Sequence, residues 1–431
     1  MMFGFPDGWK LQSVEDSMKA IIDYRGKTPR KTPSGVPLIT AKIVKDGRIM
    51  TPTEFIAAEG YDSWMNRGLP EPGDVVMTTE APLGEIAQLD NRKVALGQRL
   101  ITLRGKPDVL NNTYLKFAMQ AAFVQNQLKA RSTGTTVLGI SQRELREVEI
   151  PLPPLSEQHR IAHILGTLDQ KIELNQQMNE TLEATARAIF KSWFVDFDPV
   201  KAKKEGRKPP FMDTETAALF PSAFQDSQLG KIPKGWKVQT LGEIAENVRR
   251  SVKASEIDSR ECFLGLEHMP RRSITLFQWE TASEIQSNKS RFRKGEILLG
   301  KLNPHFHKVG VAPIDGICST DILVIQPVNV GWFGIVLGLV SSDNFVAYTS
   351  AHARGTTLPR TNWKDMSRYK IALPNVEIAK KYAEFIQPII NKIIENTHQS
   401  RTLAQTQDTL LPKLLSGEIC VDDASEMLEE T

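Results

Sequence analysis

Hydrophobic positions along this chain follow two different periods. Four short apolar runs, at 74–77, 100–103, 296–299 and 322–325, are bounded by Gly, Pro, Asn or Asp, as β-strands usually are. After each strand-rich block, apolar residues recur instead at alternating spacings of four and three residues, which is the pattern of a long helix. The chain therefore predicts two blocks of mixed α and β structure, each followed by a long helix.

The four-three spacing defines a heptad seam, the stripe along which one helix packs on another. In the first helix the seam consists of Ile161, Leu165, Leu168, Ile172, Asn175, Leu182 and Ile189. In the second helix it consists of Ile386, Ile389, Ile393, Asn396, Leu403, Leu410 and Leu414. Both seams have polar residues at equivalent positions of the repeat, because Asn175 matches Asn396 and Asn179 matches Ser400. A buried polar residue weakens a coiled coil but fixes its register, so we expect the two helices to pack on each other.

Several local features sharpen this picture. Gly166 in one helix and Pro388 in the other predict a kink or short break in each. Thr113–Leu128 has the composition of one helix between predicted strands. The segments Gly134–Thr136 and Gly355–Thr357 share the sequence Gly-Thr-Thr and are expected to form exposed turns.

An internal repeat underlies these two blocks. The string PDGWKLQSV, at 6–14, returns as PKGWKVQTL at 233–241, and the segment 132–153 matches 353–374. The first pair is displaced by 227 positions and the second by 221, so the second copy has lost a net six residues in its middle. Loops absorb such changes on a shared scaffold. The sequence thus predicts an α+β fold built from two copies of one architecture.

Composition shifts place the boundaries between these parts. The segment 198–230, which contains PVKAKKEGRKPP, has the composition of a linker. The predicted organisation is a mixed α/β domain at 1–153, a helix at 154–197, a linker at 198–230, a second mixed α/β domain at 231–374, a second helix at 375–417 and a tail at 418–431.

Bulk composition excludes several classes of protein. Hydrophobic residues make up 40% and charged residues 24% of the chain, as in ordinary globular proteins. The N-terminus lacks a basic stretch followed by an apolar run, and the longest uncharged apolar stretch, Gly331–Val340, is too short for a membrane helix. We therefore expect no membrane segment and a cytoplasmic location. Three scattered cysteines, Cys262, Cys318 and Cys420, predict neither a disulfide framework nor a zinc site.

The charge distribution favours nucleic acid as a partner without proving it. The net charge is only +3, but residues 231–376 hold twenty Lys and Arg against thirteen Asp and Glu. Basic residues cluster at Arg249, Arg250 and Lys253, and again at Lys289, Arg291, Arg293 and Lys294. A solvated surface explains such clusters equally well on composition alone.

Motifs for catalysis are incomplete. Residues 303–306, Asn-Pro-His-Phe, differ from the Asn-Pro-Pro-aromatic element of a base-methylating enzyme, and no two glycines are separated by a single residue, so a G-x-G cofactor loop is absent. Residues 295–302 imitate a phosphate-binding loop, but Leu302 stands where Ser or Thr should hold magnesium. His305 and His307 alternate onto one face of a strand-like segment, without the further ligands that a metal site needs. No catalytic, cofactor-binding or metal-binding residue is therefore assigned.

Long motifs resemble one known family. The run PLPPLSEQHRIAHILGTLDQKIELNQQMNETLEATARAIFKSWFVDFDPV, at 151–200, closely resembles the spacer of the specificity subunits of Type I restriction-modification systems. LLPKLLSGEI at 410–419 is similar to the second conserved region of these subunits, and KPPFMDTETAALFPSAF at 208–224 to their connecting segment. The resemblance covers essentially the whole chain, although within the recognition domains it is limited to the framework.

The resemblance implies two target recognition domains with pseudo-twofold symmetry, separated by two long antiparallel helices that form a coiled coil. Each domain would read one half of a bipartite, asymmetric site in double-stranded DNA, while the helices set the gap between the half-sites. It also implies two modification subunits as partners, which carry S-adenosylmethionine, and motor-nuclease restriction subunits that use ATP and Mg. The chain itself would bind no cofactor and catalyse no reaction.

Candidate DNA contacts are polar and basic residues in loops between predicted strands, because Lys, Arg, Ser and Thr suit phosphate contacts and Arg, Asn and Gln read base edges. In the first domain they are Arg25, Lys27, Thr28, Arg30, Lys31, Thr78, Thr79, Gln98, Arg99, Thr135 and Thr136. In the second domain they are Lys301, Asn303, His305, His307, Ser319, Thr320, Arg354, Thr356, Thr357 and Arg360.

Two other functions stay open at this point. A stand-alone DNA methyltransferase or nuclease would need catalytic motifs that the sequence lacks. A scaffold whose globular domains bind proteins would show binding that is insensitive to salt, whereas phosphate contacts make DNA binding fall steeply with salt.

Overall fold

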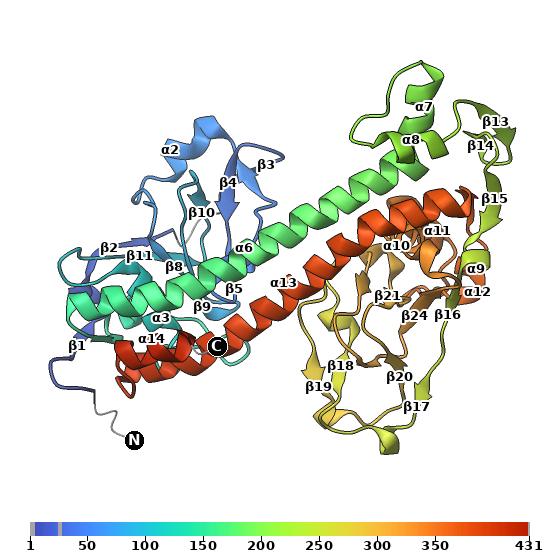
Figure 1. Cartoon of the computed structure of the whole chain (residues 1–431). Coiled ribbons are helices and arrows are strands. Elements are labelled where there is room, and N and C mark those ends of the chain that lie inside the picture. Colours follow the sequence, from blue (N-terminus) through green and yellow to red (C-terminus); the bar gives the residue numbers. More distant parts are fainter. Residues whose placement is uncertain (1–4, 25–27, 430–431) are drawn as a thin grey trace. The chain divides into compact units, whose positions relative to one another are not determined.

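The computed structural model describes residues 5–24 and 28–429 (Figure 1). The chain divides into two compact units, unit 1 with Met1–Lys171 and Leu403–Thr431, and unit 2 with Ile172–Thr402. Two long helices, α6 (Leu155–Phe194) and α13 (Val376–Ser416), contribute a segment to each unit. The remaining elements form one mixed α and β domain in each unit, so the predicted α+β fold class with two domains and two long helices is confirmed.

Unit 1 contains two four-stranded sheets and a separate strand pair. The first sheet has the antiparallel order β2 (Met18–Asp23), β11 (Leu100–Gly105), β8 (Val75–Thr79), β9 (Leu83–Gln88). The second has the order β10 (Ala95–Leu96), β4 (Val36–Ile39), β7 (Phe55–Ile56), β3 (Lys31–Thr32). The first and last strands of the domain, β1 (Lys10–Ser13) and β12 (Glu149–Leu152), pair with each other, and a short hairpin joins β5 (Val44–Lys45) to β6 (Arg48–Ile49).

The short helices of unit 1 are α1 (Val14–Ser17), α2 (Tyr61–Trp64), α3 (Asn112–Gln120), α4 (Ala122–Ala130), α5 (Gln142–Arg146) and the C-terminal α14 (Val421–Glu429). Of these, α3 and α4 pack on the first sheet. The expected single helix at 113–128 is wrong, because Ala121 is extended, with φ −64° and ψ 146°, and separates α3 from α4. The turn lets both helices reach the core, since Phe117 of α3 and Val124 of α4 are buried there.

Unit 2 repeats the central antiparallel sheet and the closing strand pair of unit 1. Its central sheet has the antiparallel order β16 (Ala245–Asn247), β24 (Ile322–Pro327), β21 (Ile297–Gly300), β22 (Val309–Val311). A five-stranded sheet has the order β17 (Ser251–Val252), β20 (Lys289–Phe292), β23 (Gly316–Cys318), β18 (Cys262–Leu264), β19 (Glu280–Thr281). The closing pair is β15 (Lys237–Thr240) with β25 (Lys370–Leu373), and the helices are α9 (Leu241–Ile244), α10 (Phe333–Val340), α11 (Asp343–Ala351) and α12 (Trp363–Met366).

The two units show the duplication that the sequence indicates. The predicted strands at 74–77, 100–103, 296–299 and 322–325 are confirmed, and they pair as β8 with β11 and as β21 with β24. The strand pair that joins the start and end of each domain is the same in both units. Shared elements therefore carry the framework, and the intervening segments differ.

The segment that composition marks as a linker has regular structure. It contains α7 (Asp198–Lys204), α8 (Thr214–Leu219) and the hairpin of β13 (Phe224–Ser227) with β14 (Gly230–Pro233). Val200, Met212 and Phe220 are buried in the core of unit 2 together with Trp236. These apolar residues are too irregularly spaced to show a helical or strand period, which is why the sequence alone did not reveal their packing.

Neither long helix is interrupted. Gly166 lies within the 40 residues of α6 and Pro388 within the 41 residues of α13, so the expectation of a short break at either residue is wrong, while that of a kink stays a prediction. Pro388 is exposed, while Ile386 and Ile390 on either side of it are buried in the core of unit 2. Packing of those neighbours stabilises the helix although proline removes one backbone hydrogen bond.

Most seam residues lie in the two cores. In unit 1, Ile161, Leu165 and Leu168 of α6 are buried with Leu410 and Leu414 of α13, and Leu403 is partly buried. In unit 2, Ile386 and Ile393 are buried, and Leu182, Ile189 and Ile389 are partly buried, with Ile390 rather than Ile389 fully covered. Ile172 is also buried, at 4% exposure. The helix segments thus pack against each other within each unit.

The polar layer of unit 2 fixes the direction of the helices. Asn175 Nδ2 donates to Gln399 Oε1 at 2.9 Å and to Ser400 Oγ at 3.3 Å. One turn further along α6, Asn396 Nδ2 donates to Asn179 Oδ1 at 2.9 Å. Positions rise along α6 while they fall along α13, so the two segments are antiparallel. Asn175 contacts Ser400, and its repeat equivalent Asn396 contacts Asn179, which is the repeat equivalent of Ser400. Such reciprocal contacts are the pattern of a pseudo-twofold axis.

The longest uncharged apolar stretch is part of a core. Its α10 helix is largely buried in unit 2. In the described part of the chain no single helix is long and apolar enough to cross a membrane, and one bent pair, Val330–Val340 with Asp343–Ala351, meets the length and composition limits only when taken together. The three cysteines are free thiols.

Candidate nucleic-acid interface

In unit 1 three loops meet at one end of the central sheet. Thr79, at the end of β8, donates its N–H to Arg99 O at 3.0 Å, and its own carbonyl accepts from Ile140 N at 3.0 Å. Two backbone hydrogen bonds between Thr133 and Gly139, at 2.8 and 2.9 Å, close the Gly-Thr-Thr loop. We call the segments 79–82, 98–99 and 133–139 the loop junction of unit 1.

Unit 2 has the same arrangement. Lys301, just after β21, donates its N–H to Asp321 O at 2.9 Å, and its carbonyl accepts from Thr361 N at 3.0 Å. Backbone hydrogen bonds of 2.9 and 2.8 Å between Arg354 and Arg360 close the second Gly-Thr-Thr loop. Asn303 N also donates to Pro359 O at 2.8 Å. The segments 301–304, 319–321 and 354–360 form the loop junction of unit 2.

Glycine is required at the start of each Gly-Thr-Thr loop. Gly134 has φ +111° and Gly355 has φ +104°, backbone conformations that side chains disfavour. A Cβ added at Gly134 would also lie 2.1 Å from Val137 O. The turn places all four threonines of these loops, Thr135, Thr136, Thr356 and Thr357, at the surface as expected.

Side chains at the two junctions differ although their backbones agree. In unit 1, Glu80 pairs with Arg99 at 2.8 Å. In unit 2 the acid comes from the other loop, where Asp321 pairs with Lys301 at 3.5 Å and with Arg360 at 3.3 Å. All these pairs are partly exposed, so each contributes about 1 kcal/mol or less to stability. Their guanidinium and ammonium groups can therefore exchange carboxylates for phosphates or base edges at small cost.

Not every candidate of unit 1 reaches the surface. Arg25 and Lys27 lie outside the described residues. Thr28 joins the junction, since its Oγ1 lies 3.4 Å from Gln98 Oε1, and Arg30 and Lys31 are exposed nearby in sequence, with Lys31 paired to Glu54. Thr78 and Thr79 are 0% and 1% exposed, so their side chains have no surface for DNA. Their place is the core, because β8 is buried on both faces.

In unit 2 the two candidate histidines, His305 and His307, lie in different environments. Residues 304–306 form a 3-10 turn and not a strand, so His305 and His307 do not share a face. His305 is exposed, whereas His307 is 7% exposed and its Nε2 lies 2.9 Å from Ser341 O. His307 therefore cannot contact DNA, while Ser319, Thr320, Arg354 and Arg360 stay within reach of the surface.

The buried His307 makes stability depend on pH. Burial lowers its pKa below the ordinary value, helped by Arg272 and Arg187 and opposed by the hydrogen bond to Ser341 and by Asp343. The unfolded chain then binds a proton more readily than the native state, so unit 2 loses stability as pH falls below about 6.5, by at most about 1.4 kcal/mol per unit. Urea unfolding at pH 7.5 and 5.5 measures this loss, and a His307→Leu variant should lose less over the same interval. An equal loss in both proteins would contradict the assignment.

A further residue at this site escaped the sequence analysis. The Arg271 guanidinium lies 3.8 Å from the centre of the Phe306 ring, and the centre of the neighbouring His305 ring lies 4.4 Å from that of Phe306. Arg271 is exposed and a guanidinium stacked on an aromatic ring is well placed to contact bases. The pair is separated by 35 positions in sequence, and no local pattern joins them.

The basic clusters of residues 249–253 and 289–294 lie on adjacent strands, with Ser251 opposite Ser290. Much of their charge is compensated. Arg250 makes a bidentate pair with Glu296 at 2.7 and 2.8 Å, and Arg291 pairs with Glu261, whose pKa it lowers. Lys289 is buried. We conclude that these clusters partly serve to hold the five-stranded sheet together.

Comparisons with known proteins agree with this geometry. A profile of the Type I restriction modification DNA specificity domain matches residues 6–184 and 233–404. The chain is 27% identical over 366 residues to the Type I restriction enzyme MjaIX specificity subunit of Methanocaldococcus jannaschii, covering 81% of this chain and 78% of that protein. It is 23% identical to the MjaVIII specificity subunit of the same organism, covering 96% and 94%.

One solved structure has a similar fold. The crystal structure of the S subunit of a Type I restriction-modification system from M. genitalium matches with a TM-score of 0.56 at 15% identity, covering 94% of this chain and 96% of that one. At this identity the match concerns the fold, two α+β domains joined by long helices.

Proposed function

Because the chain belongs to the Type I restriction-modification DNA specificity family, as a specificity subunit without catalytic function, we propose that each loop junction reads one half of a bipartite DNA site. The observation that carries this proposal is that the two loop junctions have the same backbone arrangement but different side chains. Glu80 and Arg99 face outward in one copy where Lys301, Asp321 and Arg360 do so in the other. Two readers with different side chains recognise different bases, so the site is asymmetric.

The partners follow from the family, in which a specificity subunit directs other subunits to DNA. We propose double-stranded DNA, two modification subunits with S-adenosylmethionine and restriction subunits that use ATP and Mg as partners. The antiparallel helices would hold the two readers at a fixed separation and dock the modification subunits. Since its target is chromosomal or invading DNA, the complex would act in the cytoplasm.

Removing the Arg360 side chain should impair recognition of only one half of the DNA site. We expect Arg360→Ala to weaken binding of the assembled modification complex to its site about tenfold and to relax base preference only in the half read by unit 2, because a bidentate contact to a base contributes roughly 1–3 kcal/mol. Selection of bound sequences from a random duplex library measures both effects.

The control is Lys234→Ala, which removes an exposed charge in the turn after β14. It should leave the selected sequences unchanged. Equal loss of preference in both halves after Arg360→Ala would contradict the division of labour between the junctions. Binding that does not weaken between 50 and 200 mM salt would favour a protein-binding scaffold instead, since phosphate contacts release counterions.

A further inference from the structure

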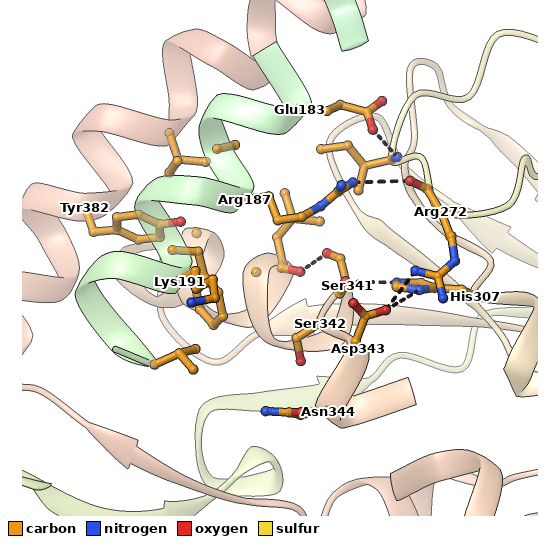
Figure 2. Close-up of a pocket in the computed structure, with 18 residues that line it drawn as sticks. Glu183, Arg187, Lys191, Arg272, His307, Ser341, Ser342, Asp343, Asn344 and Tyr382 are labelled. Carbon is orange, nitrogen blue, oxygen red and sulfur yellow. Dashed lines mark hydrogen bonds and ion pairs between the residues drawn. The ribbon is translucent and has the colours of Figure 1, made fainter. Parts of the chain in front are cut away.

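Unit 2 contains a cavity of about 290 Å³ beside the second half of α6 (Figure 2). Residues from α6, α10, the start of α11 and α13 surround it. Its apolar wall consists of Ala186, Phe190, Ile274, Leu337, Tyr382 and Ile386. Pockets for small-molecule ligands usually measure about 300–1,000 Å³, so this volume suits a single large side chain better than a free cofactor.

One wall of the cavity includes His307, whose Nδ1 atom is a buried hydrogen-bond acceptor that the described residues leave unused. The Nε2 atom of His307 lies 2.9 Å from Ser341 O, and because a carbonyl only accepts, Nε2 carries the hydrogen. In the neutral ring Nδ1 is then an acceptor, and it is buried without a hydrogen-bond partner among the described residues, 3.6 Å from Asp343 Oδ1. A buried polar atom of this kind costs roughly 1–3 kcal/mol until a partner reaches it.

Charged groups form the rim. Arg187 and Lys191 lie one turn apart on the exposed face of α6, and Arg272 lies across from them. Arg272 pairs with Asp343 at 2.9 Å, and Lys191 pairs with Asp196. Arg187 Nη2 donates to Arg272 O at 3.2 Å, which uses one of its five N–H donors. A carboxylate beside the occupant would thus find a cation at Arg187.

The small side chain of Ala186 contributes to the cavity of unit 2. At the equivalent positions 221 residues away, unit 1 has Gln407 in place of Ala186, Lys116 in place of Leu337 and Phe117 in place of Gly338. Gln407 Nε2 donates to Asp169 Oδ1 at 2.8 Å, and Lys116 pairs with the same carboxylate. In unit 1 the longer Gln407 therefore extends toward Asp169, whereas Ala186 leaves room beside α6 in unit 2. At Gly338 the ring of Phe190 already lies against the backbone.

We propose that this cavity anchors a tyrosine or tryptophan side chain of another protein subunit of the restriction-modification complex, with an acidic residue next to it in that subunit. The ring would fill the apolar space, its O–H or N–H would donate to His307 Nδ1, and the acid would pair with Arg187. Tyr and Trp are typical anchors because they combine a large apolar body with one polar group. The inference rests on the proposed function in that the partner is a subunit of this complex.

A substitution that introduces a large side chain into the cavity tests this proposal. Ala186→Trp should weaken assembly of the full chain with its modification subunit at least tenfold, measured by isothermal titration or analytical ultracentrifugation. The matched control is Ala184→Trp, which places the same side chain at an exposed position of α6 that does not line the cavity. Thermal unfolding of both variants identifies any loss of folding.

Two further measurements keep the test independent of folding. Arg187→Glu changes an exposed residue, and it should also weaken assembly. N-acetyltryptophanamide, added as a probe in NMR titrations, should shift resonances of the cavity in the natural chain, whereas its indole N-methyl analogue should bind several-fold more weakly because it has lost the donor.

Assembly of Ala186→Trp and Arg187→Glu at the strength of the control would overturn the anchor site. So would equal binding of the two probes. A complex that assembles normally with the natural chain, but binds no duplex DNA, would instead refute the proposed function and leave the anchor in place. The two failures are therefore distinguishable.

Discussion

Lengthening both long helices by one heptad is expected to move the preferred DNA site to one whose half-sites lie about three base pairs further apart. Seven residues add roughly 10 Å to a helix at ~1.5 Å per residue. Duplex DNA rises ~3.4 Å per base pair, so the two readers would meet bases about three steps more distant. The half-site sequences themselves should stay the same, because the loop junctions are untouched.

The insertion points follow from the polar layer and from the boundary between the units. A duplicate of 172–178 is placed after Lys171 in α6, and a duplicate of 396–402 after Thr402 in α13. The added segments then face each other with a second copy of the pair formed by Asn175 and Ser400. Both units keep all their own residues, and the antiparallel register continues without a shift.

Sequencing of methylated adenines in cells that carry the variant measures the gap directly. The control inserts the heptad into α6 alone, which shifts the register of the helix pair and should abolish modification at any site. If the double insertion left the gap unchanged, the helices would not set the distance between half-sites.

Replacing Ile393 by Asp is expected to destabilise unit 2 by at least about 3 kcal/mol and to abolish assembly of the complex. Ile393 is 3% exposed and belongs to the core that joins α6 and α13 in this unit. An aspartate there would be a buried charge without a partner, and such changes typically cost 3–5 kcal/mol, a large share of the stability of a domain. Denaturant unfolding monitored by tryptophan fluorescence measures the loss.

Two controls separate charge from size at this position. Ile393→Val shortens the side chain by one methylene and should cost about 1 kcal/mol. Asn391→Asp introduces the same charge two residues earlier at an exposed position and should change stability by less than about 0.5 kcal/mol. Native stability in Ile393→Asp would mean that this face of α13 is not packed.

Four hydrogen bonds between α6 and the strand-rich part of unit 2 show how helix and domain are held together. The carboxylate of Glu183, 7% exposed, accepts from Ser273 Oγ at 2.7 Å, from the N–H groups of Ile274 and Thr275 at 3.1 and 3.0 Å, and from Thr275 Oγ1 at 2.5 Å. Such a satisfied buried carboxylate fixes orientation in a way that apolar packing alone does not.

Hydrophobic spacing and repeated strings can be recognised directly in the sequence. The elements and the duplication that depend on them were therefore determined by the sequence alone. Short apolar runs bounded by turn-forming residues predicted β8, β11, β21 and β24. The four-three spacing predicted the two helices, because side-chain direction in a helix repeats with a fixed period. The duplicated strings established two copies of one architecture. The family motifs at 151–200 and 410–419 indicated the function that the comparisons then showed.

Tertiary structure decided what depends on residues far apart in the chain. Loops of three different segments form each junction, Arg271 meets Phe306, and His307 is buried against Ser341, none of which has a local signature. Burial also overrode local preference, since Ala121 adopts an extended conformation that lets two short helices reach the core, and Pro388 stays inside a helix whose neighbouring residues are packed. Periodicity indicates which face of an element is apolar, whereas only the folded chain decides which faces meet and which polar atoms are buried.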